Sequence, residues 1–144
     1  MINILTGINA TSSALEAERI RMEVITQNIA NANLAKDLDG KPYQRQQVVF
    51  EKLLNQQAGL SADGAGETGV QVARIEKDHR PPVLTYRPDD PNADPKTGMV
   101  AMPDIRIHEE MADMMVASRA FEANLAVVRN ARTMALQTLS IGKR

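Results

Sequence analysis

The chain contains no cysteine, no tryptophan and only four aromatic residues, two tyrosines and two phenylalanines, among its 144 residues. The absence of cysteine excludes disulfide bonds and thiolate sites. A compact core of this size usually holds more aromatic side chains, so an apolar fraction made of alanine, methionine and aliphatic residues suits long helices instead. No run of about 18 apolar residues occurs, and we expect no membrane insertion. The N-terminus also lacks a basic region followed by an apolar run, so we expect no cleaved secretory signal.

The charged and titratable residues form no pattern that is typical of catalysis, metal binding or nucleic-acid binding. The 17 basic and 18 acidic residues nearly balance, which argues against nucleic-acid binding through bulk charge. His79 and His108 have no second ligand at metal-binding spacing, and Ser118 falls on a packing position. Glu109 and Glu110 are adjacent, so on a helix they diverge by about 100° and form no carboxylate pair; they suit the first turn of a helix dipole. We therefore expect no catalytic residues, no metal, no cofactor and no small-molecule substrate.

The longest regular pattern runs from Ile105 to Ile141 without glycine or proline. One line of positions repeats every seven residues: Ile107, Met114, Phe121, Val128 and Ala135. A second line lies four residues further on: Met111, Ser118, Leu125, Arg132 and Leu139. Such a repeat predicts one long helix that packs along its length on another helix. We expect Asp104 to cap its first turn and Gly142 to end it in the left-handed conformation.

This helix has more apolar and small surface than one antiparallel partner covers. The following residues lie outside both lines: Met115, Val116, Ala117, Ala120, Ala123, Ala126, Val127 and Ala131. A helix that is apolar on several sides must be buried on several sides. At about 55 Å long it exceeds what the rest of the chain can wrap, so the remaining partners are expected to be other chains. The core helix of an ordinary bundle is the alternative.

The first 31 residues predict a second amphipathic helix. Its apolar stripe comprises Ile8, Leu15, Met22 and Ile29, with Ile4 and Ile25 beside it. The firm start is expected near residues 9–11, although packing would allow a start nearer Asn3. Asn28, Asn31 and Asn33 then indicate the end of the helix and a turn, and their amides are also suited to hydrogen bonds with a neighbouring chain.

The middle of the chain has the short period of β-structure. From Gln47 we expect a short strand, with a helical turn as the alternative. A flexible glycine-rich loop follows over 56–69, then a strand over 70–78 and an edge strand over 81–88, with the last two paired as a hairpin. A turn-rich connection over 87–98 leads to the last helix. The predicted fold class is α+β: two long terminal helices with a small insert containing a β-hairpin between them. The predicted parts are 1–34, 35–103 and 104–144.

Both ends of the chain resemble the rod, hook and axial family of bacterial flagellar proteins. Residues 12–37, SSALEAERIRMEVITQNIANANLAKD, are similar to the N-terminal motif of that family, and residues 102–144 are similar to the C-terminal motif of its proximal rod proteins. The segments GKPYQRQQVVFE and YRPDDPNADPKTGMVAMPDI also resemble the proximal rod type. Leu34 and Phe121 depart from the pattern, which usually has threonine and tyrosine there.

The resemblance implies that the two terminal helices pair as an antiparallel coiled coil. It also implies a structural subunit of the periplasm-spanning rod in the flagellar basal body. Its partners would be copies of itself, other rod proteins and the adaptor proteins of the rod base and MS ring. Export would use the flagellar type III system, and the assembled rod would transmit torque. The residues expected to form the assembly interface are Leu15, Met22, Ile25, Asn28, Ile29, Asn31, Met111, Met114, Phe121, Leu125, Val128 and Leu139. The rival interpretation is a small helical adaptor that forms a discrete dimer.

Overall fold

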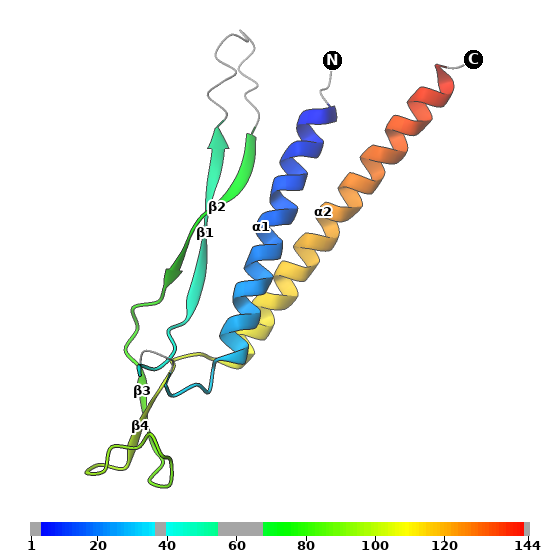
Figure 1. Cartoon of the computed structure of the whole chain (residues 1–144). Helices are drawn as coiled ribbons and strands as arrows, with labels where there is room; N and C mark the ends of the chain where they lie inside the picture. The colour runs from blue at the N-terminus through cyan, green and yellow to red at the C-terminus, as the bar shows by residue number, and fades with distance from the viewer. Residues whose placement is uncertain (1–3, 37–39, 55–67, 143–144) are drawn as a thin grey trace.

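A computed structural model of the chain describes residues 4–36, 40–54 and 68–142. Two long helices dominate it: α1, Ile4–Ala30, and α2, Ile107–Ile141. They run antiparallel, so both chain ends lie at the same end of an elongated molecule (Figure 1). The predicted α+β class, with paired terminal helices around a small insert, is confirmed. The glycine-rich loop predicted over 56–69 falls mostly outside the described residues.

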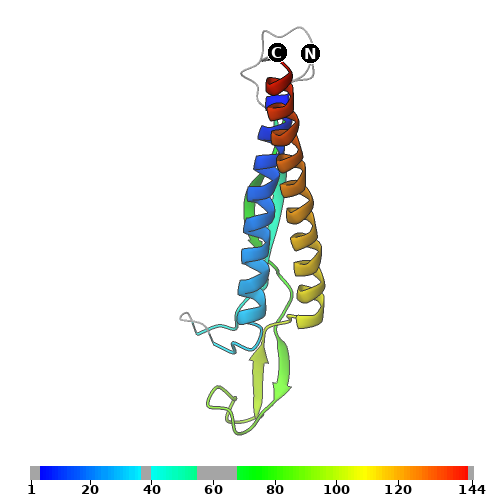
Figure 2. The ribbon, with the colours of Figure 1, turned by 90° about the vertical axis from the view of Figure 1, so that its right-hand side faces the viewer.

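The larger part of the insert is an antiparallel hairpin that lies along α1. Strands β1, Gln46–Leu54, and β2, Thr68–Lys77, pair from Gln46 opposite Lys77 to Leu54 opposite Thr68, with a bulge between Val49 and Phe50. A hydrogen bond from the Val70 backbone N–H to Ser13 Oγ, 3.1 Å long, ties β2 to α1. Helix α1 thus lies between the hairpin and α2 (Figures 1 and 2).

A second, smaller sheet forms a lobe at the end of the molecule opposite the chain ends (Figure 1). Strands β3, Val83–Tyr86, and β4, Met99–Met102, pair antiparallel. The hairpin predicted between 70–78 and 81–88 is therefore wrong, because β2 pairs with β1 and β3 pairs with a strand that the sequence pattern did not suggest. Pro81 and Pro82 lack the N–H groups that a ladder with β2 would need, and the chain continues from β2 into the lobe instead of reversing (Figure 1).

Two predicted details of the long helix are also wrong. The residue at the N-cap position of α2 is Arg106, without a side-chain cap, and Asp104 instead binds Arg80 at 3.0 Å. Gly142 ends the helix in the right-handed region, with φ at −73°, so a left-handed stop is absent. Helix α1 begins at Ile4, earlier than the firm start expected near residues 9–11, as packing against α2 and the hairpin allows.

The core of this fold is narrow and is built from small side chains. Its buried apolar residues are Ala17, Val24, Ile25, Ala32, Val100, Met102 and Ala117. Ala17, Val24 and Ile25 belong to α1 and Ala117 to α2, so the helix pair forms most of this core. Small residues at these positions let helix backbones approach closely, which explains how the chain packs without tryptophan.

Candidate assembly interface and its polar junction

The seam between the two helices, meaning the set of α2 residues that are buried or half-buried along α1, follows the first predicted line. Met114, Phe121, Val128 and Ala135 are half-buried, and only Ile107 at the start of the helix is exposed. These residues lie on the face of α2 turned toward α1. Met114, Phe121 and Val128 therefore stabilise the fold of a single chain, without any contact with a neighbouring chain.

The second predicted line lies one residue too far along the chain. Met111, Arg132 and Leu139 are exposed, and only Ser118 and Leu125 are half-buried. The positions one residue earlier lie deeper: Glu110 and Ala117 are fully buried, and Asn124 and Ala131 are half-buried. Steps along the seam alternate between three and four residues, and the sequence was read with the two steps in the wrong order.

On α1, the predicted residues divide into a buried and a half-buried group. Ile25 and Asn28 are buried, whereas Leu15, Met22, Ile29 and Asn31 are half-buried. The Asn31 amide donates a 2.9 Å hydrogen bond to the carbonyl of Gln27, so it closes the last turn of its own helix. The interpretation of Asn31 as a helix-ending residue agrees with this contact.

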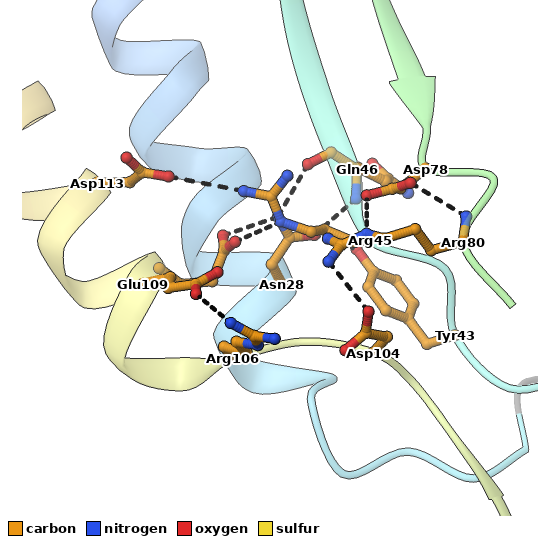
Figure 3. Close-up of polar contacts among 11 residues, drawn as sticks. Asn28, Tyr43, Arg45, Gln46, Asp78, Arg80, Asp104, Arg106, Glu109 and Asp113 are labelled. Atoms are coloured by element: carbon orange, nitrogen blue, oxygen red, sulfur yellow. Dashed lines mark hydrogen bonds and ion pairs between the residues drawn. The ribbon is translucent and has the colours of Figure 1, made fainter. Parts of the chain in front are cut away.

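At the closed end of the helix pair, a polar junction formed by Asn28, Arg45 and Glu110 joins α1, α2 and the start of β1 (Figure 3). Asn28 and Glu110 each have an exposed fraction of only 1%. Arg45 Nε donates to Glu110 Oε1 at 2.5 Å, and Asn28 Nδ2 donates to Glu110 Oε2 at 3.0 Å. Both carboxylate oxygens of a fully buried acid thus have charged or polar partners within the chain.

Asn28 meets the full hydrogen-bonding capacity of its amide. Its Nδ2 also donates to the carbonyl of Gln46, and its Oδ1 accepts from the Gln46 backbone N–H, both at 2.9 Å. The Tyr43 hydroxyl donates a further bond to Oδ1 at 3.2 Å. Two donors and two lone pairs are all the amide possesses. The side chain therefore pairs with Gln46 as one peptide group pairs with another, and it fixes the point at which β1 begins.

A wider set of ion pairs surrounds the junction and links the segments that meet there. Arg45 also lies 3.6 Å from Asp113, and Arg80 bridges Asp78 at 2.8 Å and Asp104 at 3.0 Å. The hydrogen bond from the Arg80 side chain, with a second from its backbone N–H, lowers the pKa of Asp78 below its ordinary value of 3.8. These pairs hold the connections before β1, after β2 and before α2 side by side (Figure 3).

The sequence analysis missed the junction because the position of Glu110 in the first turn of a helix already explained the presence of an acid there. An acid in the first turn of a helix is stabilised by the helix dipole wherever its side chain points. The signal that was available is spacing: Glu110, Met114, Ala117 and Phe121 follow the steps of one helix face. An acid on an apolar face calls for a basic partner, and Arg45 supplies it from 65 positions away in the chain.

Helix α2 leaves many large apolar side chains exposed. The large apolar residues of this helix that remain exposed are Ile107, Met111, Met115, Val116, Val127, Met134, Leu136, Leu139 and Ile141. Exposure increases toward the tip, reaching 67% at Leu139 and 76% at Ile141. The two helices lie closest at the junction and diverge toward the chain ends (Figure 1). Large apolar side chains exposed in this number on one helix indicate contact with a protein partner.

Known proteins share the sequence of both helices. Residues 8–33 match a family model described as "Flagella basal body rod protein", and residues 96–141 match one described as "Flagellar basal body rod FlgEFG protein C-terminal". The chain is 37% identical to the flagellar basal-body rod protein FlgC of Borreliella burgdorferi, over 97% of this chain and 98% of the relative. It is 38% identical to FlgC of Escherichia coli O157:H7 over the same shares, and 35% identical to FlgC of Bacillus subtilis over 95% and 97%.

Both ends of the chain thus carry the sequence of flagellar basal-body rod proteins, as the resemblance of their motifs predicted. With this identity over nearly the whole length, the chain belongs to the FlgC family of these proteins. No helix within the described residues is long and apolar enough to cross a membrane. The same residues contain no group of three acidic, histidine or cysteine side chains placed to hold a metal ion.

Proposed function

We propose that the chain is a structural subunit of the bacterial flagellar basal-body rod and that it assembles through its terminal helices. Its relatives are named as rod proteins. The observation that supports assembly through the helices is the number of large apolar side chains left exposed along α2 between Met111 and Ile141. Burying this surface between subunits would supply the hydrophobic free energy that holds them together.

The partners we propose are copies of the chain, other rod proteins and the adaptor proteins of the rod base. Two further exposed regions support more than one neighbour: the diverging tips of the helices, and the β3–β4 lobe, where Leu84 and Tyr86 are exposed. One partner in a closed dimer would leave some of these regions uncovered, so a discrete dimeric adaptor is not favoured. In this role the helix pair carries torsional load and needs neither a catalytic residue nor a cofactor. Export would use the flagellar type III system, and the site of action would be the periplasm-spanning rod.

The test introduces one negative charge on the exposed surface of α2 and examines cells that carry this variant. Val116 is exposed, so Val116→Asp changes that surface without adding a charge inside the chain. A strain that lacks its chromosomal copy and carries Val116→Asp is expected to lose swimming and to lack complete rods in electron tomograms of its basal bodies. Ser12→Asp, which adds the same charge at an exposed position of α1, is the matched control and should swim.

Circular dichroism of the purified variants separates assembly from folding. We expect both variants to keep the helical content of the unaltered chain. Complete rods and normal swimming in the Val116→Asp strain would contradict the proposal that this face contacts neighbours. Loss of helical content in that variant would contradict the assignment of Val116 to the free surface of the subunit.

A further inference from the structure

The apolar seam alone does not fix where α2 sits along α1. Its contacts repeat every seven residues, so a shift of α2 by seven residues, about 10 Å, again brings an apolar line against α1. The side chains that face α1 at this repeat are modest in size, with Val128 and Ala135 following Phe121. Apolar contact is not directional, and neighbouring positions of the helix therefore differ little in free energy.

The rest of the insert does not fix the position either. Within the described ranges, α2 packs against α1 and against no other helix or strand. The β1–β2 hairpin contacts α1 from another side, and the β3–β4 lobe, which directly precedes α2, packs on no other element of the described structure. Packing against the strands therefore does not hold α2 at one height. The link between the end of β2 and the segment before α2 is the partly exposed Arg80–Asp104 ion pair, 3.0 Å long.

The polar junction is the contact that distinguishes one position from the next. Arg45 and Asn28 are held on the side of α1 and β1, where Asn28 is bonded to both backbone groups of Gln46. Glu110 reaches them from α2. A shift of seven residues puts Ala117 in place of Glu110. Alanine accepts no hydrogen bond and carries no charge, so Arg45 and one N–H of Asn28 would lose their partner in a buried site.

We propose that Glu110, together with Asn28 and Arg45, determines the register of α2 on α1, and that this selection, rather than added stability, is the role of the junction. A buried polar residue in an apolar helix pair is known to act in this way, at some expense of stability. The inference concerns the isolated chain and does not depend on the proposed function. In an assembly it would ensure that every subunit presents its exposed surface at the same height.

The absence of cysteine permits a direct test with two spin labels. Ser12→Cys on α1 and Ala112→Cys on α2 are both exposed and lie outside the junction. Pulsed electron paramagnetic resonance on the purified full chain then measures the distance between the labels. With the junction intact we expect a single narrow distance, because the helix pair has one register.

The decisive variant is Arg45→Met/Glu110→Met, which removes both charges and keeps side chains of similar length. We expect it to retain its helices but to show a second distance population, displaced according to a slide of about 10 Å between the helices. Glu16→Met/Arg19→Met, which removes an exposed ion pair from α1, is the matched control and should keep the single distance. Glu110→Gln, which preserves an acceptor for Asn28, should resemble the unaltered chain.

Three results would overturn the proposal. A single, unshifted distance in Arg45→Met/Glu110→Met would mean that the apolar seam sets the register without help. Loss of helical circular dichroism in that variant would mean that the junction is required for folding itself, so register selection would not be its role. A broadened distance distribution in the Glu16→Met/Arg19→Met control as well would mean that removal of any ion pair disturbs the register and that the junction has no specific role.

Discussion

Replacing Glu110 by alanine should destabilise the chain more than any change to an exposed ion pair. The substitution removes the 2.5 Å contact with Arg45 and the 3.0 Å hydrogen bond from Asn28, and it leaves both partners in place. Removing one member of a buried ion pair costs about 3–5 kcal/mol. Arg45 keeps 17% of its side chain exposed and retains Asp113 at 3.6 Å, so the lower part of that range applies.

The expected loss is therefore about 3 kcal/mol in the free energy of unfolding for Glu110→Ala, and about 1–2 kcal/mol for Glu110→Gln, which keeps an oxygen to accept from Asn28. Equilibrium unfolding in urea, followed by far-ultraviolet circular dichroism, measures both values on the purified chain. Glu16→Ala breaks an exposed contact with Arg19 of 2.6 Å and serves as the control, with no measurable change expected.

The dependence on denaturant also checks the interpretation. We expect the midpoint to fall in Glu110→Ala while the slope stays constant, because the surface exposed on unfolding is nearly the same. A loss below about 1 kcal/mol, or one equal to that of Glu16→Ala, would refute the reasoning. Such a result would mean that Arg45 and Asn28 find water or other partners once the carboxylate is gone.

Two further predictions concern the lobe and the ion pairs near the junction. Gly98→Ala should raise the rate of amide hydrogen exchange across residues 83–102. A Cβ at Gly98 would lie 2.8 Å from the Tyr86 ring, whereas a Cβ at Gly40 would have no atom within 4 Å. Both glycines have positive φ, so Gly40→Ala is the control, and its effect on exchange near residue 40 should be smaller. Equal, local effects would show that the ring moves freely. Asp78→Asn should cost stability at pH 7, and this cost should shrink in acid. Arg80 lowers the pKa of Asp78, so the stabilisation exists above the unfolded pKa and is lost as the pH falls through the folded pKa. A stability difference independent of pH would contradict this pairing.

The helices were predictable because the signal is local, whereas their antiparallel pairing was implied by the resemblance of the chain ends to axial proteins. A seven-residue repeat over four turns or more is contained within one stretch of chain, and a helix forms from contacts within that stretch. Strand pairing is not local. Residues 70–78 were assigned to pair with their nearest neighbour in sequence, whereas β2 in fact pairs with β1 across residues 55–67. The prolines at 81 and 82 were noted as marking an edge strand, but their effect on the direction of the chain was not used.

The order of steps along the seam was not decidable from apolar residues alone. Met111 and Glu110 are adjacent, and hydrophobicity assigns the methionine to the interior. The structure places the acid there because Arg45 neutralises it and Asn28 donates to it, and both residues are remote in sequence. The same assignment made Leu139 a seam residue, although it lies on the exposed tip. One buried ion pair thus accounts for the whole displacement of the second line.

The two ends of the helix pair have opposite functions: one selects the register within the chain and the other binds neighbouring chains. A subunit that offers apolar helix surface to its neighbours also offers it to the wrong parts of itself, since such surface discriminates poorly between similar partners. Polar groups discriminate well, because a misplaced partner leaves them buried and unpaired. The chain gathers its buried polar groups where α1, α2 and β1 meet and leaves large apolar side chains exposed along α2 toward the chain ends. In a rod subunit, Glu110 would then fix the register of α2 on α1 within each chain. The exposed apolar residues would still bind neighbouring subunits strongly and with little selectivity.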